Sequence, residues 1–135
     1  ALAMIDHIRM THTLYRWDGA QTMPPELIGK TIIQATLSDD QIRLTFDDGT
    51  GVVIEDDGQS CCEHRYITTD DDLHLIQGGQ LLAIEVKDGP DAEADYDVHE
   101  TQFLEIQTSV GFVQFVTHNE HNGYYGGFYI NLRIV

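Results

Sequence analysis

Short runs in which apolar and polar residues alternate, separated by turn residues, are the feature of this sequence that most limits its fold. In residues 41–46 every second side chain is apolar, and Asp47-Asp48-Gly49 follows directly. This alternation is typical of a strand with one buried face, and Asp-Gly readily adopts the positive φ angles of a tight hairpin turn. Together with the apolar run at residues 51–55, the segment predicts an antiparallel β-hairpin.

The same pattern recurs along the chain and predicts about seven strands joined by polar turns. We expect the strands at residues 31–37, 41–46, 51–55, 80–87, 98–108, 112–117 and 128–135. A short helix is predicted over residues 71–77, because acidic capping residues precede it and Gly78-Gly79 ends it. The fold class that follows is mainly β or α+β, with an antiparallel sheet curled towards a barrel or a sandwich and one or two short helices.

The length of 135 residues fits one domain. Residues ahead of Pro24-Pro25 carry scattered apolar side chains without a sustained period, whereas strand-like alternation begins after them. We therefore expect an N-terminal arm over residues 1–26 and a single β-rich domain over residues 27–135.

The chain is strongly acidic, with 23 Asp and Glu against 7 Lys and Arg and a formal net charge of −16. A surface of that charge repels phosphate backbones, so we expect no direct binding of nucleic acid. Two interpretations of the acidity stay open. It is typical of a protein from a salt-adapted source, and it also suits a surface whose carboxylates imitate the phosphates of DNA.

We expect a cytoplasmic protein that has no membrane partner. Apolar runs are only a few residues long, far below the roughly 20 needed to cross a bilayer, and the first residues lack the pattern of a secretory signal. The two cysteines, Cys61 and Cys62, are adjacent and cannot close a stabilising disulfide loop. A reducing compartment fits this cysteine usage.

Two short clusters combine thiol and imidazole side chains, which are the ligands that zinc prefers. They read Cys61-Cys62-Glu63-His64 and His118-Asn119-Glu120-His121. In a strand Cys62 and His64 would share a face, whereas in a helical turn Cys61 would pair with His64. The sequence thus predicts a structural zinc site. Its candidate ligands are Cys61, Cys62, His64, His118 and His121.

Other interpretations of these clusters stay open, because their spacing matches neither the zinc-finger pattern nor the metalloprotease motif H-E-x-x-H. Cysteines are often buried without binding anything, and histidines near loops often only hydrogen-bond to the backbone. A third interpretation is a reactive thiol, in which His64 or Arg65 lowers the pKa of Cys61 or Cys62.

A further polar cluster begins the strand predicted at residues 98–108. Asp97 and His99 fall on one face, where a carboxylate could orient a ligating imidazole or add an oxygen ligand. Glu120 is an alternative ligand of the same kind. A solvated strand face is the competing interpretation of these residues.

The loop at residues 122–129 concentrates aromatic side chains among glycines. Glycine allows close backbone approach, and exposed aromatic rings supply rigid contact area for a partner. Tyr124, Tyr125 and Phe128 are therefore candidate contacts to a partner protein. A turn that returns some of these rings to the core is the alternative.

Three motif strings carry a resemblance to a known family: GQSCCEHRY at residues 58–66, DVHE at 97–100 and HNEHNGYYGGF at 118–128. From roughly residue 27 to the C-terminus the chain resembles a family of small uncharacterised proteins from bacteriophages and bacteria. The resemblance implies a phage or prophage context, and with it a host-interaction or anti-defence role. It brings no known activity and no catalytic residue.

We therefore expect an acidic binding domain that acts through contacts with a partner protein rather than by catalysis. One alternative is a metal-dependent hydrolase that uses the same Cys/His cluster, with Glu120 or Glu63 as the general base. Another alternative is an acidic nucleic-acid mimic that inhibits a host enzyme. Self-association into a homo-oligomer also stays open.

Overall fold

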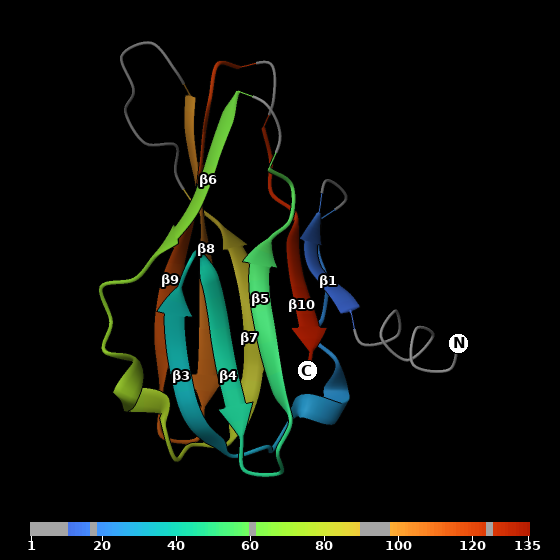
Figure 1. The fold of residues 1–135 in the computed structure, drawn as a ribbon, viewed down its shortest axis with the longest axis vertical. Helices are drawn as coiled ribbons and strands as arrows, with labels where there is room; N and C mark the ends of the chain where they lie inside the picture. Colours follow the sequence, from blue (N-terminus) through green and yellow to red (C-terminus); the bar gives the residue numbers. More distant parts are fainter. Residues whose placement is uncertain (1–10, 17–18, 60–61, 90–97, 124–125) are drawn as a thin grey trace.

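Two antiparallel β-sheets pack face to face and enclose the hydrophobic core (Figure 1). This computed structural model describes residues 11–16, 19–59, 62–89, 98–123 and 126–135. Within those residues there are ten strands and two short 3-10 helices, η1 (Pro25–Leu27) and η2 (Leu73–Ile76). Neither helix has the length or the apolar run that a membrane crossing requires.

The front layer in Figure 1 is a six-stranded sheet with the order β2-β1-β10-β5-β4-β3. Its strands are β1 (Thr11–Arg16), β2 (Gly19–Ala20), β3 (Ile32–Ser38), β4 (Gln41–Phe46), β5 (Gly51–Asp56) and β10 (Ile130–Ile134). The predicted hairpin is β4 paired with β5, and Gly49 in its turn has a φ of 85°. This is the left-handed region that glycine adopts without strain.

The second layer is a four-stranded sheet with the order β6-β9-β8-β7. Its strands are β6 (Glu63–Thr68), β7 (Leu81–Asp88), β8 (Val98–Thr108) and β9 (Gly111–His121). Figure 1 shows that β6 and the adjoining ends of β8 and β9 extend past the front sheet at the top of the molecule. This extended end carries described residues of all three motif strings.

The predicted mainly β class and single domain are confirmed, and the two sheets form a sandwich rather than a closed barrel. The helix expected over residues 71–77 is the shorter η2, whose start is capped by the Asp72 carboxylate accepting from His74 N–H. Part of the expected N-terminal arm is a strand, because β1 pairs with β10 over residues 11–15. Residues 1–10 lie outside the described ones.

Buried and more exposed residues alternate along β8 and β9, and the buried ones form the centre of the core. Leu104 and Ile106 on β8, with Val113 and Phe115 on β9, have no exposed surface. From the facing sheet Ile54 is buried in the same core. Since burial of one such side chain contributes about 1.5–3 kcal/mol, these residues hold the two layers together.

Candidate functional site

The motif residues divide between the two faces of the four-stranded sheet, because successive side chains of a strand point to opposite faces. On β9, Asn119 and His121 face the core side and are buried, whereas His118 and Glu120 face outward. The inner polar cluster consists of Asp56, Glu63, Arg65, Glu100, Asn119 and His121. The outer histidine face consists of His64, Tyr66, Thr68, His99, His118 and Glu120.

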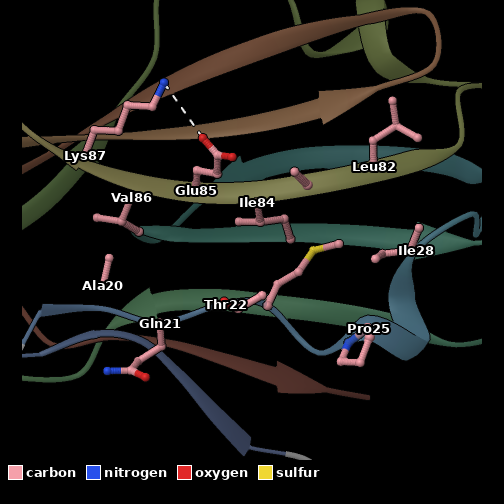
Figure 2. A pocket seen from close by; sticks show the side chains of 12 residues that line it. Ala20, Gln21, Thr22, Pro25, Ile28, Leu82, Ile84, Glu85, Val86 and Lys87 are labelled. Atoms are coloured by element: carbon pink, nitrogen blue, oxygen red, sulfur yellow. Dashed lines mark ion pairs between the residues drawn. The ribbon is translucent and has the colours of Figure 1, made fainter.

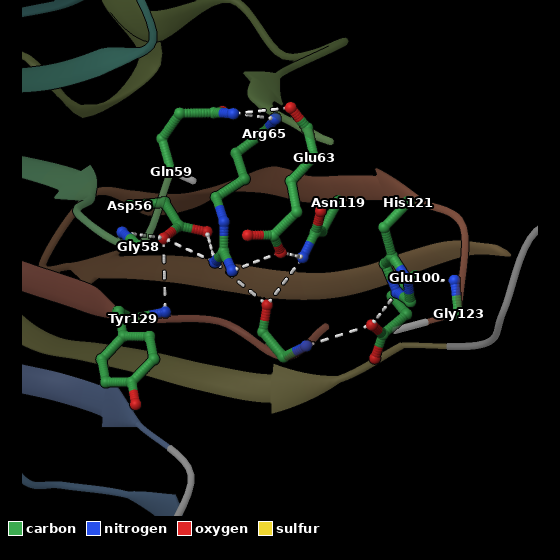
Figure 3. Close-up of polar contacts among 11 residues, drawn as sticks. Asp56, Gly58, Gln59, Glu63, Arg65, Glu100, Asn119, His121, Gly123 and Tyr129 are labelled. Atoms are coloured by element: carbon green, nitrogen blue, oxygen red, sulfur yellow. Dashed lines mark hydrogen bonds and ion pairs between the residues drawn. The ribbon is translucent and has the colours of Figure 1, made fainter. Parts of the chain in front are cut away.

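The inner polar cluster is built around the guanidinium of Arg65, whose side chain is only 4% exposed (Figure 3). Its Nη1 donates to both carboxylate oxygens of Asp56 at 3.0 Å, and its Nη2 donates to Glu63 Oε2 at 2.7 Å. The carbonyl oxygen of Gly127 accepts a further hydrogen bond from Nη1 at 3.0 Å. A buried charge is tolerated only with such partners, so the two carboxylates are a requirement of burying Arg65.

Asp56 connects the two sheets, because it ends β5 in the six-stranded sheet while Arg65 lies on β6 in the four-stranded sheet. Its Oδ1 also accepts the backbone N–H groups of Gly58 at 3.0 Å and Tyr129 at 3.3 Å. Burial raises the pKa of the Asp56 carboxyl, while the Gly58 hydrogen bond and the charge of Arg65 act against that rise.

Asn119 extends the cluster to the loop that follows β9. Its Nδ2 donates to Glu63 Oε2 at 2.8 Å and to the carbonyl oxygen of Gly127 at 3.1 Å. Gly127 has a φ of 75°, a backbone conformation that side chains rarely adopt. The returning end of the loop is thus held by a carbonyl that accepts from both Arg65 and Asn119.

A pair between buried His121 and partly exposed Glu100 completes the cluster, with Nε2 and Oε1 2.6 Å apart. The Gly123 backbone N–H donates to His121 Nδ1 at 3.0 Å, so the imidazole proton sits on Nε2 and is donated to Glu100. Glu100 Oε1 also accepts from Gly127 N–H at 3.0 Å. At Gly126 an added Cβ would lie 2.6 Å from that same carboxylate oxygen, so a side chain at this position would displace the Glu100 carboxylate from its hydrogen bonds.

Two hydrogen bonds on the outer histidine face hold His118. Its Nε2 lies 2.8 Å from Thr68 Oγ1, and its Nδ1 lies 2.8 Å from His99 Nε2. A neutral His118 donates through one ring nitrogen and accepts through the other, so it satisfies both contacts in either tautomer. Burial lowers the pKa of His118 first, the neighbouring His99 lowers it further, and the charge of Glu120 opposes both effects.

Tyr66 lies at the centre of this face. Its ring stacks on His118 with centroids 4.3 Å apart, and its hydroxyl lies 3.4 Å from His99 Nε2. Burial and then a hydrogen bond to Glu120 raise the pKa of Tyr66. His64 is strongly exposed, with Nδ1 3.7 Å from Glu120 Oε2. The face therefore presents a connected set of rings on a sheet surface.

The predicted zinc ligands do not meet at one point among the described residues. His118 and His121 lie on opposite faces of β9, because this strand runs beyond the predicted residue 117 to His121. Cys62 precedes β6 and lines a shallow surface pocket together with His64 and His121. In the described part of the chain no three or more His, Cys, Asp or Glu side chains are arranged to hold a metal ion.

The aromatic loop is described only in part. Phe128 is 4% exposed and packs into the core, so its ring is not the surface contact that the sequence predicted. Tyr124 and Tyr125 lie outside the described residues, as do Cys61 and Asp97. Their predicted roles stay predictions.

Sequence reasoning missed the two residues on which the inner cluster depends. The sequence patterns assign Arg65 only an effect on the neighbouring thiols, and they do not single out Asp56. One signal was available: Arg65 stands two residues before Ile67 and two after Glu63, which places all three on one face of a strand. An arginine on the apolar face of a strand needs buried carboxylate partners.

We predict that Arg65→Leu destabilises the fold by about 3–5 kcal/mol, because it leaves buried carboxylates without their cation. Urea unfolding measures the difference. Lys87→Leu is the matched control, since Lys87 lies in an exposed ion pair with Glu105 and its loss should change stability little. Equal effects of the two substitutions would contradict the role given to Arg65.

We also predict that the protein loses stability as the pH falls below 6.5, the usual pKa of histidine. Because the folded state lowers the pKa of His118, the unfolded chain binds its proton first, and this favours unfolding until the pH lies below both pKa values. His118→Gln should flatten this part of the curve of unfolding free energy against pH. The same slope in variant and wild type would show that His118 does not cause it.

Comparisons with known proteins give a family and no function. Neither a curated protein nor a solved structure matches the chain. The family model of a domain of unknown function, DUF7448, matches residues 25–130, which include every member of the inner polar cluster and of the outer histidine face. The chain therefore belongs to the DUF7448 family.

Proposed function

We propose that this protein is a binding module that contacts a partner protein through the outer face of its four-stranded sheet. The phage or prophage context that the motif strings imply supports a host protein as the partner. Catalysis is not part of the proposal. It rests on a difference between the two outward faces of the sandwich.

The six-stranded sheet carries one strongly exposed apolar side chain, Ile33 on β3, and the rest of its described outward face is mostly polar. Gln41 donates to Glu55 at 2.7 Å, Arg43 donates to Gln41 at 2.7 Å, and Arg133 lies 3.5 Å from Glu55. This polar layer covers Val53, which is 1% exposed. Polar side chains on the outer face are the usual pattern for a sheet that buries only its other face.

The outward face of the four-stranded sheet departs from that pattern and carries the proposal. Beside the outer histidine face, β8 and β9 place three more apolar side chains outward: Phe103, Val116 and Phe112. Phe112 is 61% exposed. An exposed apolar and aromatic surface of this kind is typical of a protein contact, because rings add contact area at a small entropic cost.

The inner polar cluster supports a binding module over a hydrolase. Its carboxylates and His121 are engaged with Arg65, Asn119 and loop backbone groups, so both ring nitrogens of His121 already have partners. A general base needs an open nitrogen or oxygen within reach of its substrate. The inner polar cluster is therefore arranged to position the loop after β9.

For a zinc ion we propose a place on the outer histidine face with two protein ligands, His99 and His118, whose nitrogens lie 2.8 Å apart. Imidazole nitrogen is a suitable zinc ligand. Elemental analysis of purified protein should then find zinc in the wild type and lose it in His99→Ala. Absence of zinc from the wild type, or its retention in His99→Ala, would contradict this placement.

The binding proposal predicts that Phe112→Lys and Tyr66→Ala each weaken partner binding about tenfold or more, because aromatic contacts dominate protein interfaces. A partner captured from bacterial lysate is identified by mass spectrometry, purified, and titrated by calorimetry against each folded variant. Ile33→Lys is the matched control, since Ile33 is an apolar side chain on β3 with 54% exposure, comparable to Phe112.

Wild-type affinity for Ile33→Lys, with weakened binding by both outer-face variants, is the expected pattern. Equal loss from Ile33→Lys would contradict a contact through the four-stranded sheet. If the affinity for the partner is unchanged by all three substitutions but decreases steeply with salt concentration, the result would instead favour the acidic mimic.

A further inference from the structure

A groove of about 380 Å³ runs alongside β7, the last strand of the four-stranded sheet (Figure 2). One wall is formed by residues 82–87 and the opposite wall by residues 20–23, Pro25 and Ile28. Consecutive residues of a strand point to opposite faces. A groove that six consecutive residues line must therefore lie against the edge of the strand, where the backbone is accessible.

Every second residue of β7 directs its backbone N–H and C=O groups away from β8. Gly89 N–H donates to β8 at 3.2 Å, and the register of β7 on β8 then directs the backbone groups of Glu85 and Lys87 towards β8 as well. The N–H and C=O groups of Ile84 and Val86 consequently point away from β8, into the groove.

This edge is already used for pairing at its beginning. Leu81 N–H donates to the Lys30 carbonyl oxygen at 2.9 Å, and the Leu81 carbonyl accepts from Gly29 N–H at 2.7 Å. Beyond Leu81, β7 has no strand partner on this side within the described part of the chain. An extended segment lying in the groove would continue the pairing that Gly29 and Lys30 begin.

The side chains of the groove define what such a segment carries. Met23, Ile84 and Val86 are nearly buried and form an apolar floor, whereas Leu82 and Ile28 are 49% and 54% exposed at the rim. Aliphatic side chains at every second position of an added strand would cover this apolar surface.

The charges at the rim favour a cationic segment. Lys87 Nζ lies 2.8 Å from Glu105 Oε2 and 3.8 Å from Glu85 Oε2, so two carboxylates compensate its single charge. Glu26, next to Pro25 of the groove wall, is also exposed. Together with the net charge of −16, this arrangement attracts lysine and arginine.

We propose that the groove beside β7 binds an extended segment of a partner protein, which adds to the sheet as a further strand. Its aliphatic side chains alternate and face the groove, and lysine or arginine residues flank them. This inference goes beyond the contact proposed for the outer sheet face and does not depend on it.

Selection of random peptides displayed on phage, with the full-length protein as bait, provides the probe. The selected sequences should have aliphatic residues at every second position and basic residues on either side.

A synthetic copy of a selected peptide should slow hydrogen exchange at the amides of Ile84 and Val86. The amides of Glu85 and Lys87 should change little, because they are already bonded to β8. Leu82→Lys should weaken the peptide about tenfold. Leu75→Lys, at a side chain 59% exposed on η2, is the matched control and should bind like the wild type.

The proposal would be overturned if the selected peptides bound Leu82→Lys as tightly as Leu75→Lys, if they protected amides away from β7, or if no peptide were enriched over unrelated bait. It would also be overturned if the Ile84 and Val86 amides were protected without peptide in a sedimenting dimer, because a second copy of the chain would then be the occupant. Phe112→Lys should retain peptide binding, so failure here is distinguishable from failure of the outer-face contact.

Discussion

The buried ion cluster of Arg65 is the interaction on which the rest of this structure depends. It joins β5 of one sheet to β6 of the other through Asp56, and it fixes the loop after β9 through Gly127. Removal of either charge of an ion pair at this depth is strongly destabilising, because the remaining charge stays desolvated without its partner. The cluster thus makes the extended end of the sandwich a defined structure rather than a frayed one.

That arrangement explains why the motif residues lie on both faces of one sheet. The inward residues Asn119 and His121 bind Glu63, Glu100 and the loop backbone, while His118 and Glu120 lie on the outward face. The groove along β7 is a separate feature of the same sheet. In our account a partner meets side chains on the sheet face and backbone groups at the sheet edge, two modes of recognition that a β-sandwich presents together.

The strands with an apolar face could be predicted from the sequence, but the end of the sandwich that carries the inner polar cluster could not. Residues 41–46 and 98–108 are strands at the predicted bounds, because their apolar residues recur at every second position. β9 runs four residues further than predicted, to His121, where both faces are polar and alternation gives no signal. The pairing of Asp56 with Arg65 depends on the packing of two sheets, which no local pattern contains.

A double-mutant cycle between Asp56 and Arg65 tests the central claim most directly, since it isolates the contact that joins the sheets. The free energy of unfolding is measured for the wild type, Asp56→Asn, Arg65→Leu and the double variant. Our account predicts a coupling energy of about 2 kcal/mol or more, with the double variant far less destabilised than the sum of the single ones. Additive losses, within about 0.5 kcal/mol, would contradict it.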